Sequence, residues 1–358
     1  MSQVKETKSA TQKYDVGSWL IPIISVIAAM LVASILMLIQ GLDPILAYNS
    51  LFSTAFGSSK GIASTLGKAT PLVLSGLAVT LGLRAGLFNI GVQGQLLTGA
   101  LASAWAGYAL TNLPPIIHIS VALGFGFFFG ALVGAIAGYL KAFRGVHEVI
   151  TTIMLNSIVM GIVDYLASHP FKEPDQALTR TPQILESVRL PMFGTFPSGF
   201  FLSVVLAAFM WWILGFTTTG FRFNTVGRNK FAAWYAGISF KKTILFAMLF
   251  SGGIAGLGGA VETLGITYRF EPAFNLGLGF DGITIALLGR IHPLGIIPGA
   301  ILIGGMRAGA ANMQFDAGVA PELVDLLLAM ILLFVTAPLI SRFFKNSSNR
   351  TMTGGWGN

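Results

Sequence analysis

Amide and aromatic side chains gather around a five-residue motif that occurs twice in the sequence. Residues 88–92 (FNIGV) recur as residues 274–278 (FNLGL), and each copy precedes a polar cluster. The clusters contain Gln93 and Gln95 after the first copy and Asp281 after the second. Gly-interrupted segments at matching places in two halves of a membrane chain are typical of a transport pathway. The alternative is chance similarity within Gly-rich apolar sequence.

Charged side chains inside apolar segments are a second source of chemistry, because ionised groups are costly in a membrane and each one is a functional hypothesis. Three carboxylates lie within such segments and one near the end of another: Glu262, Asp281, Asp325 and Asp164. Ion coupling would use carboxylates of this kind. Arg307 also lies in an apolar segment, and we favour its pairing with Asp325 or Glu322 across a helix contact over a proton relay.

The sequence shows no pattern typical of an enzyme. The four histidines share no metal-ligand spacing, and the absence of cysteine excludes disulfides and Cys-ligated metal. Residues 61–69 resemble a phosphate-binding loop, but the spacing between the glycines is one residue too long and Ala69 replaces the Mg²⁺-binding Ser or Thr. We therefore expect no ATP hydrolysis and no cofactor on this chain. Active transport would draw on an ion gradient or on another subunit.

A basic segment at residues 217–242 contains a predicted short helix. Asn229 can cap a helix over 230–236, and Gly237 can end it. One face of this helix is an apolar stripe at helical spacing, formed by Phe231, Trp234, Tyr235 and Ile238. The segment around it contains five basic residues and no acid. Such a helix lies either on anionic lipid or in the groove of a cytoplasmic partner. Residue types alone leave both interpretations open.

Composition indicates the elements that must hold these residues. Hydrophobic residues make up 54% of the 358 residues and charged residues only 10%, which is too little charge to cover a soluble domain. The sequence therefore predicts an all-α membrane protein with ten spans, some short or broken, and an internal inverted repeat. The predicted spans are 18–39, 62–83 (interrupted at Lys68 and Pro71), 91–110, 116–140, 147–167, 197–216, 243–264, 274–290 (short and Gly-rich), 293–311 and 322–341.

The distribution of basic residues predicts the orientation. With the N-terminus inside, most of the 22 Lys and Arg residues fall on the cytoplasmic side, as the positive-inside rule requires. This arrangement makes residues 1–17 and 342–358 cytoplasmic tails around a membrane domain at 18–341. It also places 168–196 outside and 217–242 inside. An eight-span chain with re-entrant pairs would keep the same ends.

Glycines recur at four-residue spacing along one predicted span, at positions 126, 130, 134 and 138. This spacing places them on one helix face, where a neighbouring backbone can approach closely. We favour static packing over a sliding surface for this stripe. Glycines 295, 299, 304 and 305 predict a similar contact.

Several motifs together resemble those of bacterial nucleoside ABC-importer permeases, which are akin to sugar and branched-chain amino-acid permeases. The matching segments, spread between about residues 60 and 340, are 84–95, 147–156, 235–238, 279–290 and 307–310. The sequence departs from the family pattern at Gln93, where an acid is usual, and at Leu328, where a polar residue is usual. Both departures concern the substrate more than the class of transporter.

The resemblance implies a permease in the bacterial plasma membrane that works with other subunits. These are cytoplasmic ATPases that hold ATP and Mg²⁺, a second related permease (as a heterodimer), and an extracellular substrate-binding lipoprotein. The basic segment then becomes the coupling segment, with four residues contacting the ATPase: Arg228, Phe231, Trp234 and Tyr235. The resemblance implies no nucleic-acid partner.

A nucleoside is neutral, with a flat base and a hydroxylated sugar, so its pathway needs amides and aromatic faces. The predicted pathway residues are Phe88, Asn89, Gln93, Gln95, Asn156, Phe274, Asn275 and Asp281. An interhelical hydrogen bond is the alternative role for each of the amides. A sugar or another small neutral solute would use much the same residue types. An ion-coupled secondary transporter and a membrane scaffold are weaker alternatives.

Overall fold

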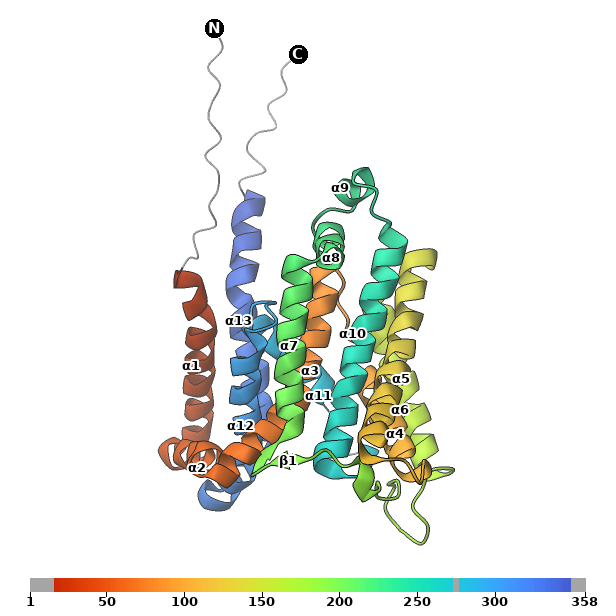
Figure 1. The fold of residues 1–358 in the computed structure, drawn as a ribbon. Coiled ribbons are helices and arrows are strands. Elements are labelled where there is room, and N and C mark those ends of the chain that lie inside the picture. The colour runs from red at the N-terminus through yellow and green to blue at the C-terminus, as the bar shows by residue number, and fades with distance from the viewer. Residues whose placement is uncertain (1–15, 273–276, 349–358) are drawn as a thin grey trace.

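Helices dominate the computed structural model, which describes residues 16–272 and 277–348 (Figure 1). In chain order these are α1 (Val16–Ile39), α2 (Pro44–Phe56), α3 (Ser59–Arg84), α4 (Val92–Ala109), α5 (Pro115–Arg144), α6 (Glu148–Ser168), α7 (Ser198–Phe216), α8 (Thr218–Arg228), α9 (Lys230–Tyr235), α10 (Phe240–Glu262), α11 (Leu278–Leu288), α12 (Ile296–Ala317) and α13 (Glu322–Ser348). A 3₁₀ turn, η1 (Glu186–Val188), and a π-helical turn, η2 (Thr263–Thr267), complete the helical elements. The two-residue strands β1 (Met192–Phe193) and β2 (Phe196–Pro197) pair antiparallel.

Each predicted span contains a helix, although not all are full length. Seven helices in the described residues are long and apolar enough to cross a membrane: α1, α3, α5, α6, α7, α10 with η2, and α12. α11 has 11 residues, which corresponds to a length of about 16 Å, roughly half of the hydrocarbon core. The expected short span is therefore confirmed as a half-length helix. α13 continues to Ser348, into the predicted C-terminal tail.

The helices run between two ends of the molecule (Figure 1). At one end, called here the α9 end, α1 begins, α13 ends, and α8 and α9 lie. At the other, the α2 end, lie α2 and the β1–β2 hairpin. This arrangement agrees with the alternation of spans predicted from the sequence.

α3 forms the centre of the bundle. Its side chains from Leu72 to Leu77 are fully or almost fully buried, and it packs against α10, α11 and α12. The sequence predicted an interruption at Lys68 and Pro71, but α3 is continuous through both. Proline removes only one backbone hydrogen bond, and neighbouring membrane helices can hold the helix in place.

The glycine stripe of α5 packs directly against α10, which confirms the predicted close contact. A Cβ atom added to Gly130 would lie 2.5 Å from the carbonyl oxygen of Gly252 and 2.7 Å from Cα of Gly256. A Cβ on Gly134 would likewise meet the backbone of Met248 and Gly252. Only glycine permits backbones this close. In α12, Gly304 packs in the same way against the backbone of α3.

The segment between α6 and α7 folds back over the α2 end. The Ile184 amide donates to the Tyr268 carbonyl at 2.9 Å, and the Leu185 amide donates to the Gly107 carbonyl at 3.0 Å. His118 of α5 is fully buried and bonds Ser187 at 2.9 Å through Nδ1. These bonds attach the segment to the ends of α4, α5 and α10.

Candidate functional site

Asn89 is the centre of a buried hydrogen-bond network between α3 and α4. Its Nδ2 donates to Gln95 Oε1 at 2.9 Å and to Ser251 Oγ of α10 at 2.8 Å. Its Oδ1 accepts from the Gly91 amide at 3.0 Å. The Ser251 hydroxyl in turn donates to the carbonyl of Ala78, within the last two turns of α3. After α3 ends, the chain therefore turns back into the bundle before α4 begins.

Asn156 and Gln93 fix the start of α4 from its other sides. Asn156 Oδ1 of α6 accepts from the Gly94 amide at 2.9 Å, and its Nδ2 donates to the Ile90 carbonyl at 2.9 Å. Gln93 Oε1 accepts from the Gly279 amide, in the first turn of α11, at 2.8 Å. This hydrogen bond joins two residues 186 positions apart in the chain and holds the start of α4 against the start of α11.

The two helices leave this meeting point in opposite directions. α4 runs toward the α2 end, where Gly107 meets the segment between α6 and α7. α11 runs toward the α9 end, where the Ile291 carbonyl that follows it accepts from Nε of Arg84 at 3.0 Å. The two copies of the repeated motif therefore precede helices of opposed direction, as an inverted repeat predicts.

The predicted pathway residues differ in how deeply they are buried. The amides of Asn89, Gln93 and Gln95 are almost completely buried, and Phe88 is half-buried. Phe274 and Asn275 lie outside the described residues. A pathway role for all of these residues stays a prediction. The structure shows the groups to which the amide side chains are hydrogen-bonded.

Asp281 belongs to an ionic cluster on α11, α12 and α13. Arg307 of α12 contacts Asp281 Oδ2 through Nε at 2.8 Å and through Nη2 at 2.5 Å. The same Nη2 lies 3.3 Å from Asp325 Oδ1 of α13. The predicted pairing of Arg307 with Asp325 is confirmed, and Asp281 is an additional partner.

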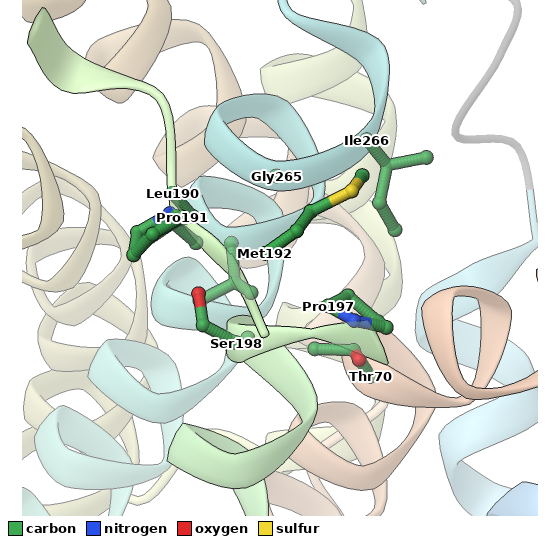
Figure 2. Close-up of a pocket in the computed structure, with 10 residues that line it drawn as sticks. Thr70, Leu190, Pro191, Met192, Pro197, Ser198, Gly265 and Ile266 are labelled. Carbon is green, nitrogen blue, oxygen red and sulfur yellow. The ribbon is translucent and has the colours of Figure 1, made fainter. Parts of the chain in front are cut away.

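Three cavities of the structure do not match a polar solute. The cavity in Figure 2, between the hairpin, α3 and α10, has a volume of about 10 Å³ and is lined by residues such as Thr70, Ser198 and Gly265. A volume of this size holds about one water molecule. Larger hollows of about 580 Å³ (α4, α5 and α6) and 570 Å³ (α3, α7, α8 and α10) have almost entirely apolar linings. Among the residues that the structure describes, no predicted pathway residue lines these three cavities.

At the α9 end, the predicted short helix is present as α9. Asn229 Oδ1 accepts from the amides of Phe231 and Ala232 at 2.9 and 3.1 Å, and Gly237 follows with φ +70°. The aromatic side chains of the stripe are solvent-exposed: Phe231 by 65%, Trp234 by 71% and Tyr235 by 84%. Ile238 instead packs against the core. Arg228 is exposed beside them.

A backbone contact joins this surface to the buried network. Gly86, with φ +76°, opens the turn that leads to Asn89, and a Cβ on it would lie 2.9 Å from Cα of Gly227 in α8. His292, in the loop between α11 and α12, feels the positive charge of Arg84. Burial and this charge lower the pKa of the His292 imidazole below its usual value, so the ring is neutral at physiological pH. The sequence analysis missed α8 and this contact, although the glycines at 86 and 227 were a signal for it.

This architecture, with a buried polar network and exposed aromatics at one end, defines a multi-pass α-helical membrane protein. Residues 61–336 match the family described as "Branched-chain amino acid transport system / permease component". The chain belongs to this family of transport permeases.

Relatives cover nearly the whole chain. It is 40% identical to the guanosine ABC transporter permease protein NupP of Bacillus subtilis (strain 168), over 90% of this chain and 94% of the relative. It is 35% identical to the nucleoside ABC transporter permease protein NupB of Lactococcus lactis subsp. cremoris (strain MG1363), over 90% and 91%. It is also 32% identical to the glucose ABC transporter permease protein TsgB13 of Haloferax volcanii, over 92% and 90%.

Proposed function

We propose that this chain is the permease subunit of an ATP-driven importer and forms part of the translocation pathway for nucleosides. The observation that carries the proposal is its identity of 40% and 35%, over nine tenths of the chain, to permeases named for guanosine and for nucleosides. Because the glucose permease is 32% identical, a sugar is the second candidate substrate. Both substrates are neutral and hydroxylated, in keeping with the amide-rich motifs.

The exposed aromatic residues of α9, called here the α9 surface (Phe231, Trp234 and Tyr235), are the proposed contact with a cytoplasmic ATPase that binds ATP and Mg²⁺. Phe231, Trp234 and Tyr235 form an exposed aromatic set on a short capped helix, the form in which a helix enters a groove. Arg228 adds a basic rim. This assignment places the α9 end, with the start of α1 and the end of α13, on the cytoplasmic side of a bacterial plasma membrane. The ATPase subunit would hydrolyse the ATP, because the sequence of this chain contains no phosphate-binding loop.

The α2 end is then extracellular, where a substrate-binding lipoprotein would deliver the nucleoside. A second, related permease completes the proposed complex. Bacillus subtilis and Lactococcus lactis each provide a further, more distant relative named as a permease for the same solute, NupQ and NupC, at 26% and 24% identity. These pairs favour a heterodimer.

The amides at the start of α4 are proposed to position the pathway. Asn89, Gln93, Gln95 and Asn156 bond mainly to one another and to backbone, and they hold the start of α4 against α6, α10 and α11. The contact of Gly86 with Gly227 lets motion of the α8–α9 segment reach this network. ATPase movement would thereby change the position of the buried starts of α4 and α11.

The test is uptake of labelled uridine and guanosine by cells with and without the gene for this chain, each with excess unlabelled glucose or leucine. We expect uptake to fall in the deletion and neither competitor to reduce it in the parent. A parent whose uptake is abolished by glucose would make the chain a sugar permease. Unchanged nucleoside uptake after deletion, in a strain without other nucleoside carriers, would refute the proposal.

A further inference from the structure

The hollow of about 570 Å³ lies on the side of the bundle, between α7 and α10. Helix α3 forms its inner wall through Leu77 and Leu81, and α8 borders it through Thr219 and Phe223. α7 itself packs against α3 and α8 (Figure 1). Because α8 lies at the α9 end, the hollow belongs to the half of the membrane domain nearer that end. Its volume is within the range of small-molecule sites, about 300–1,000 Å³.

The lining of this hollow suits a hydrocarbon chain. Thr217 and Thr219 are the only lining residues that are not apolar, and the Thr217 hydroxyl already donates to the Ile213 carbonyl at 2.7 Å. Two aromatic lining residues are half exposed, Trp212 of α7 by 50% and Phe250 of α10 by 44%. Since α7 and α10 are both long and apolar enough to span the membrane, this open side faces lipid.

One face of α10 leads from the membrane boundary to the hollow. Lys242, Phe246 and Phe250 follow one another at four-residue spacing, so they lie on the same face. The rings of Phe246 and Phe250 are stacked, with centroids 6.5 Å apart. From Lys242, in the first turn, to Ile254 in the lining, α10 rises by about 18 Å. One leaflet of the hydrocarbon core is roughly 15 Å thick, so the distance matches one lipid tail with its head group beside Lys242.

The entrance to the hollow carries positive charge. Arg222, the residue before Phe223 in α8, is exposed, as is Lys242. Within the part of the chain that the structure describes, no carboxylate forms an ion pair with either side chain. Basic side chains at a membrane boundary extend toward the head groups and attract anionic ones. The charge therefore favours an anionic lipid over a zwitterionic one.

We propose that the hollow between α7 and α10 binds one tail of an anionic phospholipid, and that Lys242 and Arg222 hold the phosphate of its head group. The tail would pack against Thr219 and Phe223 and support α8, which leads to the α9 surface. The inference does not depend on which solute the permease carries. It requires only that the start of α10 lies at a boundary of the membrane.

The experiment uses the full chain, purified in detergent with the subunits that accompany it and stripped of lipid. Phosphatidylglycerol (anionic) or phosphatidylcholine (zwitterionic) is titrated in, and bound lipid is counted by native mass spectrometry. We expect the wild type to bind phosphatidylglycerol more tightly. Lys242→Gln should weaken that binding about fivefold, equivalent to the roughly 1 kcal/mol of one basic residue at an anionic surface, and leave phosphatidylcholine unchanged. Lys241→Gln is the matched control and should keep the preference, because Lys241 lies over the Phe143 ring of α5, 5.5 Å from its centroid.

A second pair of variants tests the position of the tail. Leu206→Trp fills the hollow and should weaken both lipids at least fivefold. Val205→Trp places the same side chain at an exposed neighbouring position outside the lining, and both lipids should bind as in the wild type.

Four results would overturn the inference. A wild type without preference for phosphatidylglycerol excludes an anionic lipid. Equal phosphatidylglycerol binding by Lys242→Gln and Lys241→Gln removes the head group from this entrance. Lipid binding that Leu206→Trp leaves unchanged removes the tail from the hollow. If Leu206→Trp instead lowers co-purification of the second permease at unchanged lipid binding, the hollow is a contact between chains.

Discussion

The substitution Gly130→Ala tests the close packing of α5 on α10. The added methyl group would lie 2.5 Å from one backbone atom of α10 and 2.7 Å from another. An ordinary contact with carbon is about 3.5 Å, so the helices must separate by roughly 0.8–1 Å. No side-chain rotation relieves the clash, because the opposing atoms belong to the backbone of Gly252 and Gly256.

Overpacking of this kind costs about 1–3 kcal/mol. The displacement also reaches α4, because Gly99 packs against the backbone of Gly256 on another side of α10. Domains of 150–250 residues lose about 2–4 °C per kcal/mol, and a longer chain loses less, so we expect a thermal midpoint lower by at most roughly 2–12 °C. Uptake should fall at least in proportion to the folded protein, because α4 carries the Asn89 network.

The assay is the loss of the monodisperse size-exclusion peak after heating, with the complex in detergent. Gly124→Ala is the matched control in the same helix, since a Cβ at Gly124 meets nothing within 4 Å. Alanine is a better helix former than glycine by up to about 1 kcal/mol, so the control should be as stable as wild type or more. A Gly130→Ala protein as stable as the control would refute the packing argument.

Further predictions concern the network and the α9 surface. Asn89→Ala should lower uptake while the complex still assembles, because the loss of buried hydrogen bonds removes about 1–3 kcal/mol that holds the start of α4; unchanged uptake would remove Asn89 from the machinery. Trp234→Ala should reduce both uptake and co-purification of the ATPase without loss of membrane insertion. Phe193→Ala, an exposed aromatic at the α2 end, should change neither, and normal co-purification in Trp234→Ala would contradict the coupling role. Gly227→Ala should keep the ATPase bound but slow transport, and wild-type rates would show that the contact with Gly86 transmits no motion.

The sequence was sufficient for features set by local patterns. Apolar runs located every spanning helix, and Asn229 with Gly237 delimited α9, because capping needs only neighbouring residues. The four-residue glycine spacing of α5 likewise predicted a close helix contact, although not its partner. Pairing with α10 depends on tertiary structure, which no single-helix pattern contains.

The contacts of the candidate site could not be predicted in the same way. Asn89 and Ser251 are 162 residues apart in the chain, and only the packing of α10 on α3 brings them together. The sequence analysis noted the Ser251–Gly252 pair without assigning it a partner. α2 was missed because 13 residues are too few for a span and its apolar face is short.

The meeting of α4 and α11 also has an electrostatic consequence. The amino end of a helix carries a partial positive charge of about half an elementary unit, and here two such ends face each other deep in the bundle. Asp281 lies in the first turn of α11, but Arg307 pairs with it and neutralises most of its charge, so Asp281 and the amide oxygen of Gln93 offset only part of the potential of the helix ends. A cation at this depth would still meet a repulsive potential, whereas an uncharged solute would not. The same joint that shortens α4 and α11 thus works against leakage of protons and metal ions through the permease.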